Sequence, residues 1–148
     1  MKLFQIEEPE GAPLSADGPG AAVGIDLAGD WAAVAIAVGG NAEILPGPDG
    51  AWRLQTAGQN LAALLLALRS RAEKQLARPV THAVIATDGE TGGAALEAAA
   101  KAAGLVILRI VTRQSAGGNR PGADAAALGA ANLAEDLAPA AAIGTPQD

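Results

Sequence analysis

The sequence contains no cysteine and no tyrosine, and it has one histidine, one phenylalanine and two tryptophans. The absence of cysteine excludes disulfide bonds, zinc sites with thiolate ligands and a cysteine nucleophile. A single histidine excludes metal sites that are built from several imidazoles. Because aromatic residues make up 2% of the 148 positions, a hydrophobic core has to be assembled from aliphatic side chains.

Positive charge is also scarce. Ten Lys and Arg against 16 Asp and Glu give a net charge of −6. A chain of this charge is repelled by nucleic acids and by anionic membranes, so we expect neither as a partner. The apolar runs are too short to cross a bilayer, and the acidic opening does not resemble a signal peptide. We therefore expect a cytoplasmic protein.

Alanine is abundant and fills about a quarter of the positions, well above ordinary usage. The core should therefore combine Leu, Ile, Val and Ala, with helices that pack closely; Gly129, Ala130 and Ala131 are expected to let the last helix approach a neighbour. Composition divides the chain into a flexible acidic and Gly/Pro-rich arm (1–20), a single α/β domain (21–137) and a tail (138–148).

Hydrophobic periodicity and turn residues predict the secondary structure. Strands are expected at residues 21–28, 31–38, 42–46, 80–87 and 105–112, and helices at residues 58–77, 94–103 and 123–137. Residues 52–55 could rejoin the edge formed by the third strand, and residues 114–122 are expected to be a Gly-rich loop. This order is typical of the ribonuclease H-like fold. That fold has a five-stranded mixed sheet in the order 3-2-1-4-5, an antiparallel second strand and helices on both faces.

One carboxylate interrupts the apolar pattern. Residues 22–37 consist of two apolar runs that are joined by a turn of small residues, and Asp26 lies inside the first run. Burying a carboxylate costs several kcal/mol unless it is paired, hydrogen-bonded or bound to a metal. Asp26 therefore needs either a structural partner or a functional role.

This hairpin resembles the first phosphate-binding hairpin of actin and of the DnaK-type (seventy-kilodalton heat-shock) chaperone ATPases, which usually reads Gly-Ile-Asp-Leu-Gly-Thr-Thr-Asn-Ser. Residues 24–27 keep the start of that pattern. Weaker matches to the chaperone family follow in the same order at residues 66–76, 79–85, 103–110 and 127–131. The resemblance implies the base subdomain of the first lobe of an actin-like ATPase domain. It also implies a vestigial phosphate site at Gly24, Asp26 and Gly29.

The chain departs from the family where nucleotide chemistry takes place. Ala28, Gly29 and Asp30 stand where the family has Gly-Thr-Thr, and Asp30 is negative where a phosphate would approach. After the last strand, the family segment that carries a catalytic carboxylate matches residues 112–115, and Arg113 replaces the acid. Phosphoryl transfer depends almost entirely on positioned phosphate ligands and metal. We therefore expect a degenerate nucleotide-binding domain that does not hydrolyse ATP and has no bound cofactor.

The resemblance thus predicts a non-catalytic, chaperone-like protein that acts through contact with a partner protein or with itself. Trp31 and Trp52 either pack within the fold or, where exposed, are the candidate anchors, because tryptophan is enriched where binding energy concentrates in interfaces. The opening residues 3–9 are similar to the start of the family member devoted to iron–sulfur cluster assembly, which implies that cellular context.

Two alternatives remain open at this stage. Asp26 lies near the carboxyl end of the first strand, Asp88 follows the fourth strand, and Asp124 lies at the start of the last helix. In a ribonuclease H-like fold these three points can come close together. Three carboxylates there would bind paired Mg²⁺ and make the chain a metal-dependent nuclease. The other alternative is residual nucleotide binding, with vestigial ATP and Mg²⁺ but without hydrolysis.

Overall fold

A mixed sheet of six strands forms the centre of the computed structural model, which describes residues 20–89 and 92–139. The strands are β1 (Ala21–Leu27), β2 (Trp31–Val38), β3 (Asn41–Ile44), β4 (Leu54–Gln55), β5 (Val80–Thr87) and β6 (Val106–Thr112). The helices are α1 (Leu61–Leu76), α2 (Gly93–Ala102), α3 (Arg113–Gly117) and α4 (Ala125–Leu137). The predicted arm and nearly all of the predicted tail lie outside the described residues.

The strands follow the order β3-β2-β1-β5-β6, and β4 pairs with β2 beside this path. β1, β5 and β6 are parallel, whereas β2 runs antiparallel to β1, β3 and β4. The prediction of five strands was wrong, and the order differs because of the additional strand. Leu54 and Gln55 return to β2 opposite Ala32 and Trp31, so the chain uses the same edge of β2 twice.

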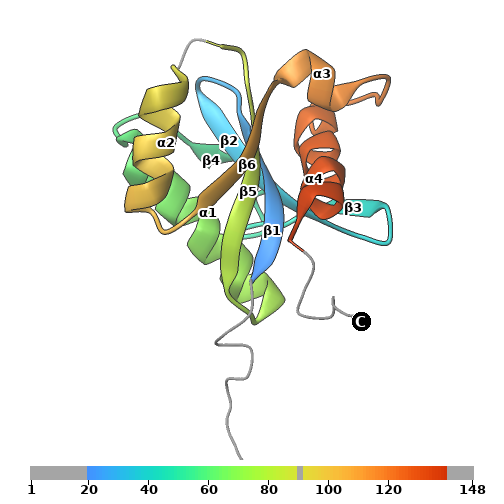
Figure 1. The fold of residues 1–148 in the computed structure, drawn as a ribbon, viewed down its shortest axis with the longest axis horizontal. Helices are drawn as coiled ribbons and strands as arrows, with labels where there is room; N and C mark the ends of the chain where they lie inside the picture. The colour runs from blue at the N-terminus through green and yellow to red at the C-terminus, as the bar shows by residue number, and fades with distance from the viewer. Residues whose placement is uncertain (1–19, 90–91, 140–148) are drawn as a thin grey trace, which may run out of the picture. The chain divides into compact units, whose positions relative to one another are not determined.

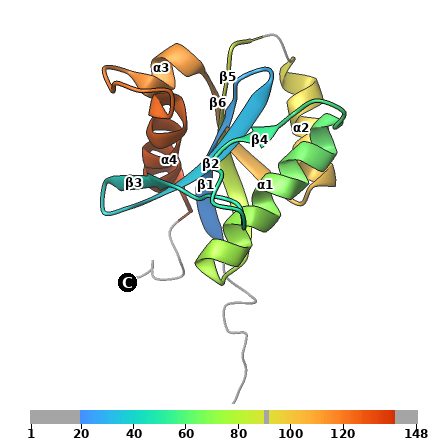
Figure 2. The same ribbon diagram turned by 180° about the vertical axis from the view of Figure 1, so that it is seen from behind.

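Helices cover both faces of the sheet, as predicted. α1 and α2 lie on one face and α4 lies on the other, with α3 at the end of β6 (Figures 1 and 2). The larger core lies under α1 and α2, and its fully buried side chains include Ile25, Leu65, Leu68, Ile85 and Leu96. The α4 side is built mainly from alanines, which include Ala33, Ala35, Ala86, Ala127 and Ala130.

α4 approaches the sheet and α3 at backbone distance. A Cβ atom on Gly24 of β1 would collide with the main chain of Ala130 and Ala131, and one on Gly129 would collide with the carbonyl of Ala116. Both glycines are therefore required by packing. The prediction that Gly129, Ala130 and Ala131 allow a close approach is confirmed.

The segment after β6 differs from the prediction. Residues 113–117 form the short helix α3 instead of the start of a loop. The Thr112 hydroxyl accepts a hydrogen bond from the backbone N–H of Ser115 at 3.0 Å, which is the usual N-cap arrangement. This cap turns the chain at the end of β6 and places Arg113 in the first position of the helix.

Capping residues mark both ends of α1. It begins after Asn60, whose side chain accepts a hydrogen bond from the backbone N–H of Ala63 at 2.8 Å, and Ala77 caps its C-terminal end in the left-handed conformation.

Within residues 20–89 and 92–139, no helix combines the length and the apolarity that a bilayer crossing requires.

Candidate functional site

Asp26 is fully buried and is held by an arginine that lies far away along the chain. Arg113 donates from Nε to Oδ1 at 2.6 Å and from Nη2 to Oδ2 at 3.0 Å, so both carboxylate oxygens are engaged. The arginine side chain is 33% exposed, whereas that of Asp26 is not exposed at all. This fork-to-fork geometry is the strongest form of an arginine–carboxylate pair.

The neighbouring strands leave room for this guanidinium. Asp26 points to the α4 side of the sheet, where it pairs with Ala33 on β2 and with Ala86 on β5. Both partners end at a methyl group, so Arg113 can reach across them from the first position of α3. The alanine-rich face therefore accommodates an ion pair that larger cross-strand neighbours would block.

The ion pair changes the pKa of Arg113. The hydrogen bond to Asp26 raises the pKa of the Arg113 guanidinium above its ordinary value, and the charges of Asp26 and Asp88 add to the effect. Partial burial acts in the opposite direction. Arg113 therefore remains a cation, as required for a partner of a buried carboxylate.

Trp31 connects this pair to a second tryptophan and a second arginine. The rings of Trp31 and Trp52 meet edge to face with centroids 5.2 Å apart. Arg53 places its guanidinium 4.7 Å from the Trp31 ring and 4.6 Å from the Trp52 ring, and Arg113 lies 5.5 Å from the Trp31 ring. We call Trp31, Trp52 and Arg53 the tryptophan cluster. Cation–π contacts of this kind fix both partners.

The hairpin tip beside the cluster is held by β4 and the residue that follows it. Thr56 donates from its hydroxyl to the carbonyl of Gly29 at 2.7 Å and from its backbone N–H to the carbonyl of Asp30 at 3.3 Å. The N–H of Ala28 bonds to the carbonyl of Trp31 within the hairpin. A phosphate cradle needs outward-facing N–H groups that are not already bonded. The Ala28 N–H is thus not available for such a role.

Each residue of the predicted phosphate site has a structural role in the fold. Gly24 is needed for the approach of α4, and Gly29 adopts a φ of 101° in the hairpin turn, a conformation that favours glycine. Asp26 is neutralised by Arg113. Packing, turn geometry and ion pairing therefore account for all three residues without a nucleotide.

The three carboxylates of the predicted metal site lie in different surroundings. Asp26 is buried and paired, Asp88 is exposed at the end of β5, and Asp124 precedes α4. Asp124 lines an open hollow of about 300 Å³ together with Ile44, Pro46 and Trp52. Within the described ranges, no group of three or more acidic, histidine or cysteine side chains could hold a metal ion.

Sequence reasoning missed two features of this site. It identified Arg113 as the replacement of an acid but did not connect it with Asp26, although a buried carboxylate requires a cation nearby. It also missed Arg53, and no pattern in the sequence distinguishes this arginine from the other exposed ones. The two tryptophans, by contrast, were singled out separately and the structure brings them into contact.

Comparison with models of known protein families and with curated protein sequences finds no match. The similarity to chaperone ATPases is therefore a resemblance of short sequence motifs.

Proposed function

We propose that this chain is a non-catalytic binding protein on a ribonuclease H-like scaffold, related to the base subdomain of DnaK-type chaperone ATPases. Its tryptophan cluster contacts a partner protein. The observation that carries the proposal is the bidentate grip of Arg113 on Asp26, because this grip occupies the one carboxylate that the resemblance assigns to metal and phosphate chemistry.

Two features argue against phosphoryl transfer: the ion pair at Asp26 and the negative charge of Asp30. A divalent cation at Asp26 would have to displace a guanidinium that already binds both oxygens. The exposed Asp30 adds negative charge at the hairpin tip, where a triphosphate would approach. Phosphoryl transfer needs metal and positioned phosphate ligands, and this arrangement favours neither.

The tryptophan cluster has the composition of an interface anchor. Trp and Arg are the residue types most enriched at positions that dominate binding energy. Both tryptophans are half-buried, and Arg53 is exposed above them. Because the edge-to-face contact and the cation–π contacts hold these side chains in place, little conformational entropy would be lost on binding.

Iron–sulfur cluster assembly in the cytoplasm is the cellular context that we propose. It follows from the resemblance of residues 3–9 alone, and these residues lie outside the part of the chain that the structure describes. Proteins of that assembly process are therefore the first set in which to search for a partner.

Titration calorimetry tests the absence of catalysis. The wild-type protein is titrated with Mg²⁺, with Mn²⁺ and with ATP in the presence of Mg²⁺, and we expect no heat of binding from any of them. Metal binding that Asp26→Asn abolishes would favour the nuclease. An ATP-dependent rise in the melting temperature without hydrolysis would favour residual nucleotide binding.

Quantitative co-precipitation tests the partner contact. Trp52→Ala and Arg53→Ala should each reduce recovery of a specific partner at least about tenfold, since anchor residues typically contribute about 2 kcal/mol or more. Leu66→Ala is the matched control because Leu66 is an exposed apolar residue on α1 and does not belong to the cluster. Equal recovery with all three variants would remove the cluster as the binding surface.

The cluster also provides its own spectroscopic readout. Trp31 and Trp52 are the only tryptophans, and the chain has no tyrosine, so its fluorescence arises almost wholly from this surface. Addition of the isolated partner should shift the emission of the wild-type protein and of Leu66→Ala alike. An unchanged spectrum on complex formation would place the contact elsewhere.

A further inference from the structure

β6 forms the second edge of the sheet, and it is longer than either β3 or β4 at the first edge. Among residues 20–89 and 92–139, β5 is the only strand that pairs with it. The seven residues of β6 contain neither proline nor glycine, and none of them is buried. Val106 is 56% exposed, Arg109 is the single charged residue, and the others apart from Thr112 are apolar.

The opposite edge shows how the same sheet is protected elsewhere. β3 and β4 have four and two residues, and the segment between them contains Pro46 and Pro48. Gln75 of α1 donates to the carbonyl of Pro46 at 3.2 Å, and Arg71 donates to the carbonyl of Trp52 at 3.3 Å. Short strands, prolines and covering side chains are the devices that block edge-to-edge pairing. β6 is longer and contains no proline; its own protective features are the charge of Arg109 and a register irregularity where Leu108 has no partner on β5.

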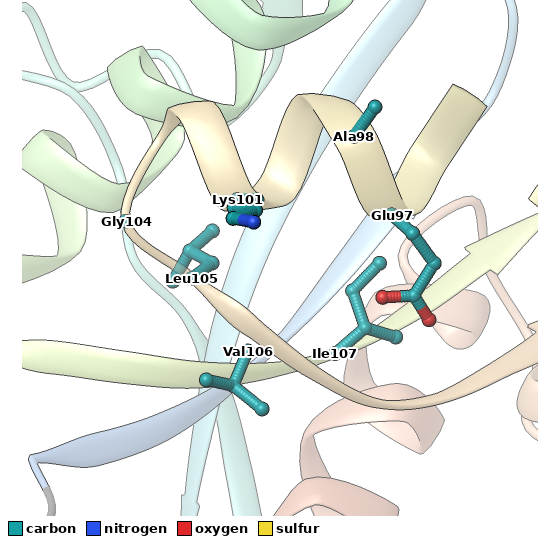
Figure 3. A pocket seen from close by; sticks show the side chains of 7 residues that line it. All are labelled: Glu97, Ala98, Lys101, Gly104, Leu105, Val106 and Ile107. Carbon is teal, nitrogen blue, oxygen red and sulfur yellow. The ribbon is translucent and has the colours of Figure 1, made fainter. Parts of the chain in front are cut away.

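A hollow of about 520 Å³ lies beside this edge, between α2 and β6 (Figure 3). Leu105 lies between the helix and the strand, Ile107 points toward α2 beside Glu97, and Val106 points away from the helix. The aliphatic part of Lys101 lies over the same hollow. An apolar side chain from a strand added at the β6 edge would have a site to fill.

The charges at this edge indicate which strand would be added. In a symmetric pairing with a second copy, Arg109 lies at the middle of β6 and would face its own counterpart, and like charges directly opposite are destabilising. Glu97 and Lys101 line the hollow with opposite charges, so Arg109 is the charge at this edge that would select a partner. In a chain with a net charge of −6, this edge therefore favours an acidic partner over another copy of itself.

We propose that β6 receives an extended segment of a partner protein, which pairs with it through main-chain hydrogen bonds. The segment carries alternating apolar side chains, one of which enters the hollow, and an acidic residue opposite Arg109. Addition of a strand to a free sheet edge is an established mode of peptide recognition. The surface shares no residue with the tryptophan cluster and does not depend on it.

Two eight-residue peptides of alternating valine and threonine test this proposal in the full chain. One has a glutamate at its fourth position and the other has a lysine there. Amide NMR shifts and hydrogen exchange are followed at residues 106–112 as each peptide is added. We expect the glutamate peptide to shift and protect these amides, and to bind about fivefold more tightly than the lysine peptide.

Variants of the exposed arginine separate charge from shape. Arg109→Glu should reverse the preference between the two peptides, and Arg109→Gln should abolish it, while Leu66→Glu on α1 leaves it unchanged. The proposal is overturned if the β6 amides do not respond, or if wild-type protein binds both peptides equally. Protection of the same amides that rises with protein concentration, without peptide, would overturn it in favour of a second copy.

Discussion

The two faces of the sheet are packed in opposite ways. Under α1 and α2, large side chains such as Leu65, Leu68 and Ile85 fill the space between helix and sheet. Under α4, alanines and Gly24 let the helix backbone rest on the strands. The first face buries apolar area, which is the main source of stability. The second face buries less apolar area, but its small residues let the backbone of α4 lie close to the strands.

The candidate site depends on the small side chains of the α4 face. Asp26 lies on the α4 face between alanine neighbours, and Arg113 reaches it because nothing larger intervenes. A polar pair of this kind could not fit beneath α1 without displacing leucines. The comparison therefore predicts that the two faces respond differently to changes in volume and charge.

The largest effect should come from removing the cation on the α4 face. Arg113→Ala leaves Asp26 buried without a partner, and we expect a loss of about 4 kcal/mol in the free energy of unfolding, measured with urea. The double variant Asp26→Asn with Arg113→Met should recover most of this loss, since no unpaired charge remains. If the double variant is as unstable as the single one, the ion pair does not account for the effect.

Adding volume on the α4 face and removing volume on the α1 face should lower the free energy of unfolding by similar amounts. Gly24→Ala adds one methyl group where the α4 backbone already lies, and we expect a loss of about 3 kcal/mol. Leu65→Ala removes atoms from the fully buried α1 side and should cost about the same, because it leaves a cavity. Urea unfolding measures both. Tolerance of Gly24→Ala would show that α4 is free to move away from β1.

A smaller effect should arise where α4 secures the turn between β2 and β3. The Glu135 carboxylate accepts from the backbone N–H of Gly39 at 2.6 Å and from that of Gly40 at 2.9 Å. Glu135→Ala should cost about 1 kcal/mol, because both bonds lie at the surface. Asp136→Ala is the matched control on the same helix, and equal losses in the two variants would contradict a specific role for Glu135.

The smallest effect should be the pH dependence of stability that arises from His82. Burial lowers the pKa of His82 below its ordinary value of 6.5, so the unfolded chain binds this proton more readily than the folded one. Stability from this group is therefore present above pH 6.5 and is lost as the pH falls through and below that value. Melting temperatures on either side of that value should differ for the wild-type chain and less so for His82→Gln. A larger difference in the variant would contradict the sign of the shift.

The elements themselves could be predicted because their patterns are local. β2 and β5 have the predicted bounds, and the predicted helices were found within a few residues of their expected ends. β4 was anticipated only as a return of residues 52–55 to the sheet edge, because two residues carry no periodicity of their own and are defined only by their partners on β2. α3 was missed because its N-cap, Thr112, also ends an apolar strand.

The site was predictable only in part. Asp26 was recognisable as a carboxylate that needed a partner, and Trp31 and Trp52 as rare, large side chains. That these tryptophans touch each other and Arg53 could not be read from their positions, since a turn and a strand pairing bring them together. Their role in binding stays a prediction.

The sequence by itself determined the longer strands and helices, because periodicity and capping act over a few residues; β4 and α3 were exceptions. It also determined that α4 had to be a helix of small side chains. The tertiary structure alone decided which cation neutralises Asp26, since Arg113 is 87 residues away along the chain. It also decided which edge strand has a single pairing partner among residues 20–89 and 92–139, because both outcomes depend on how distant strands align and on the space that their neighbours leave.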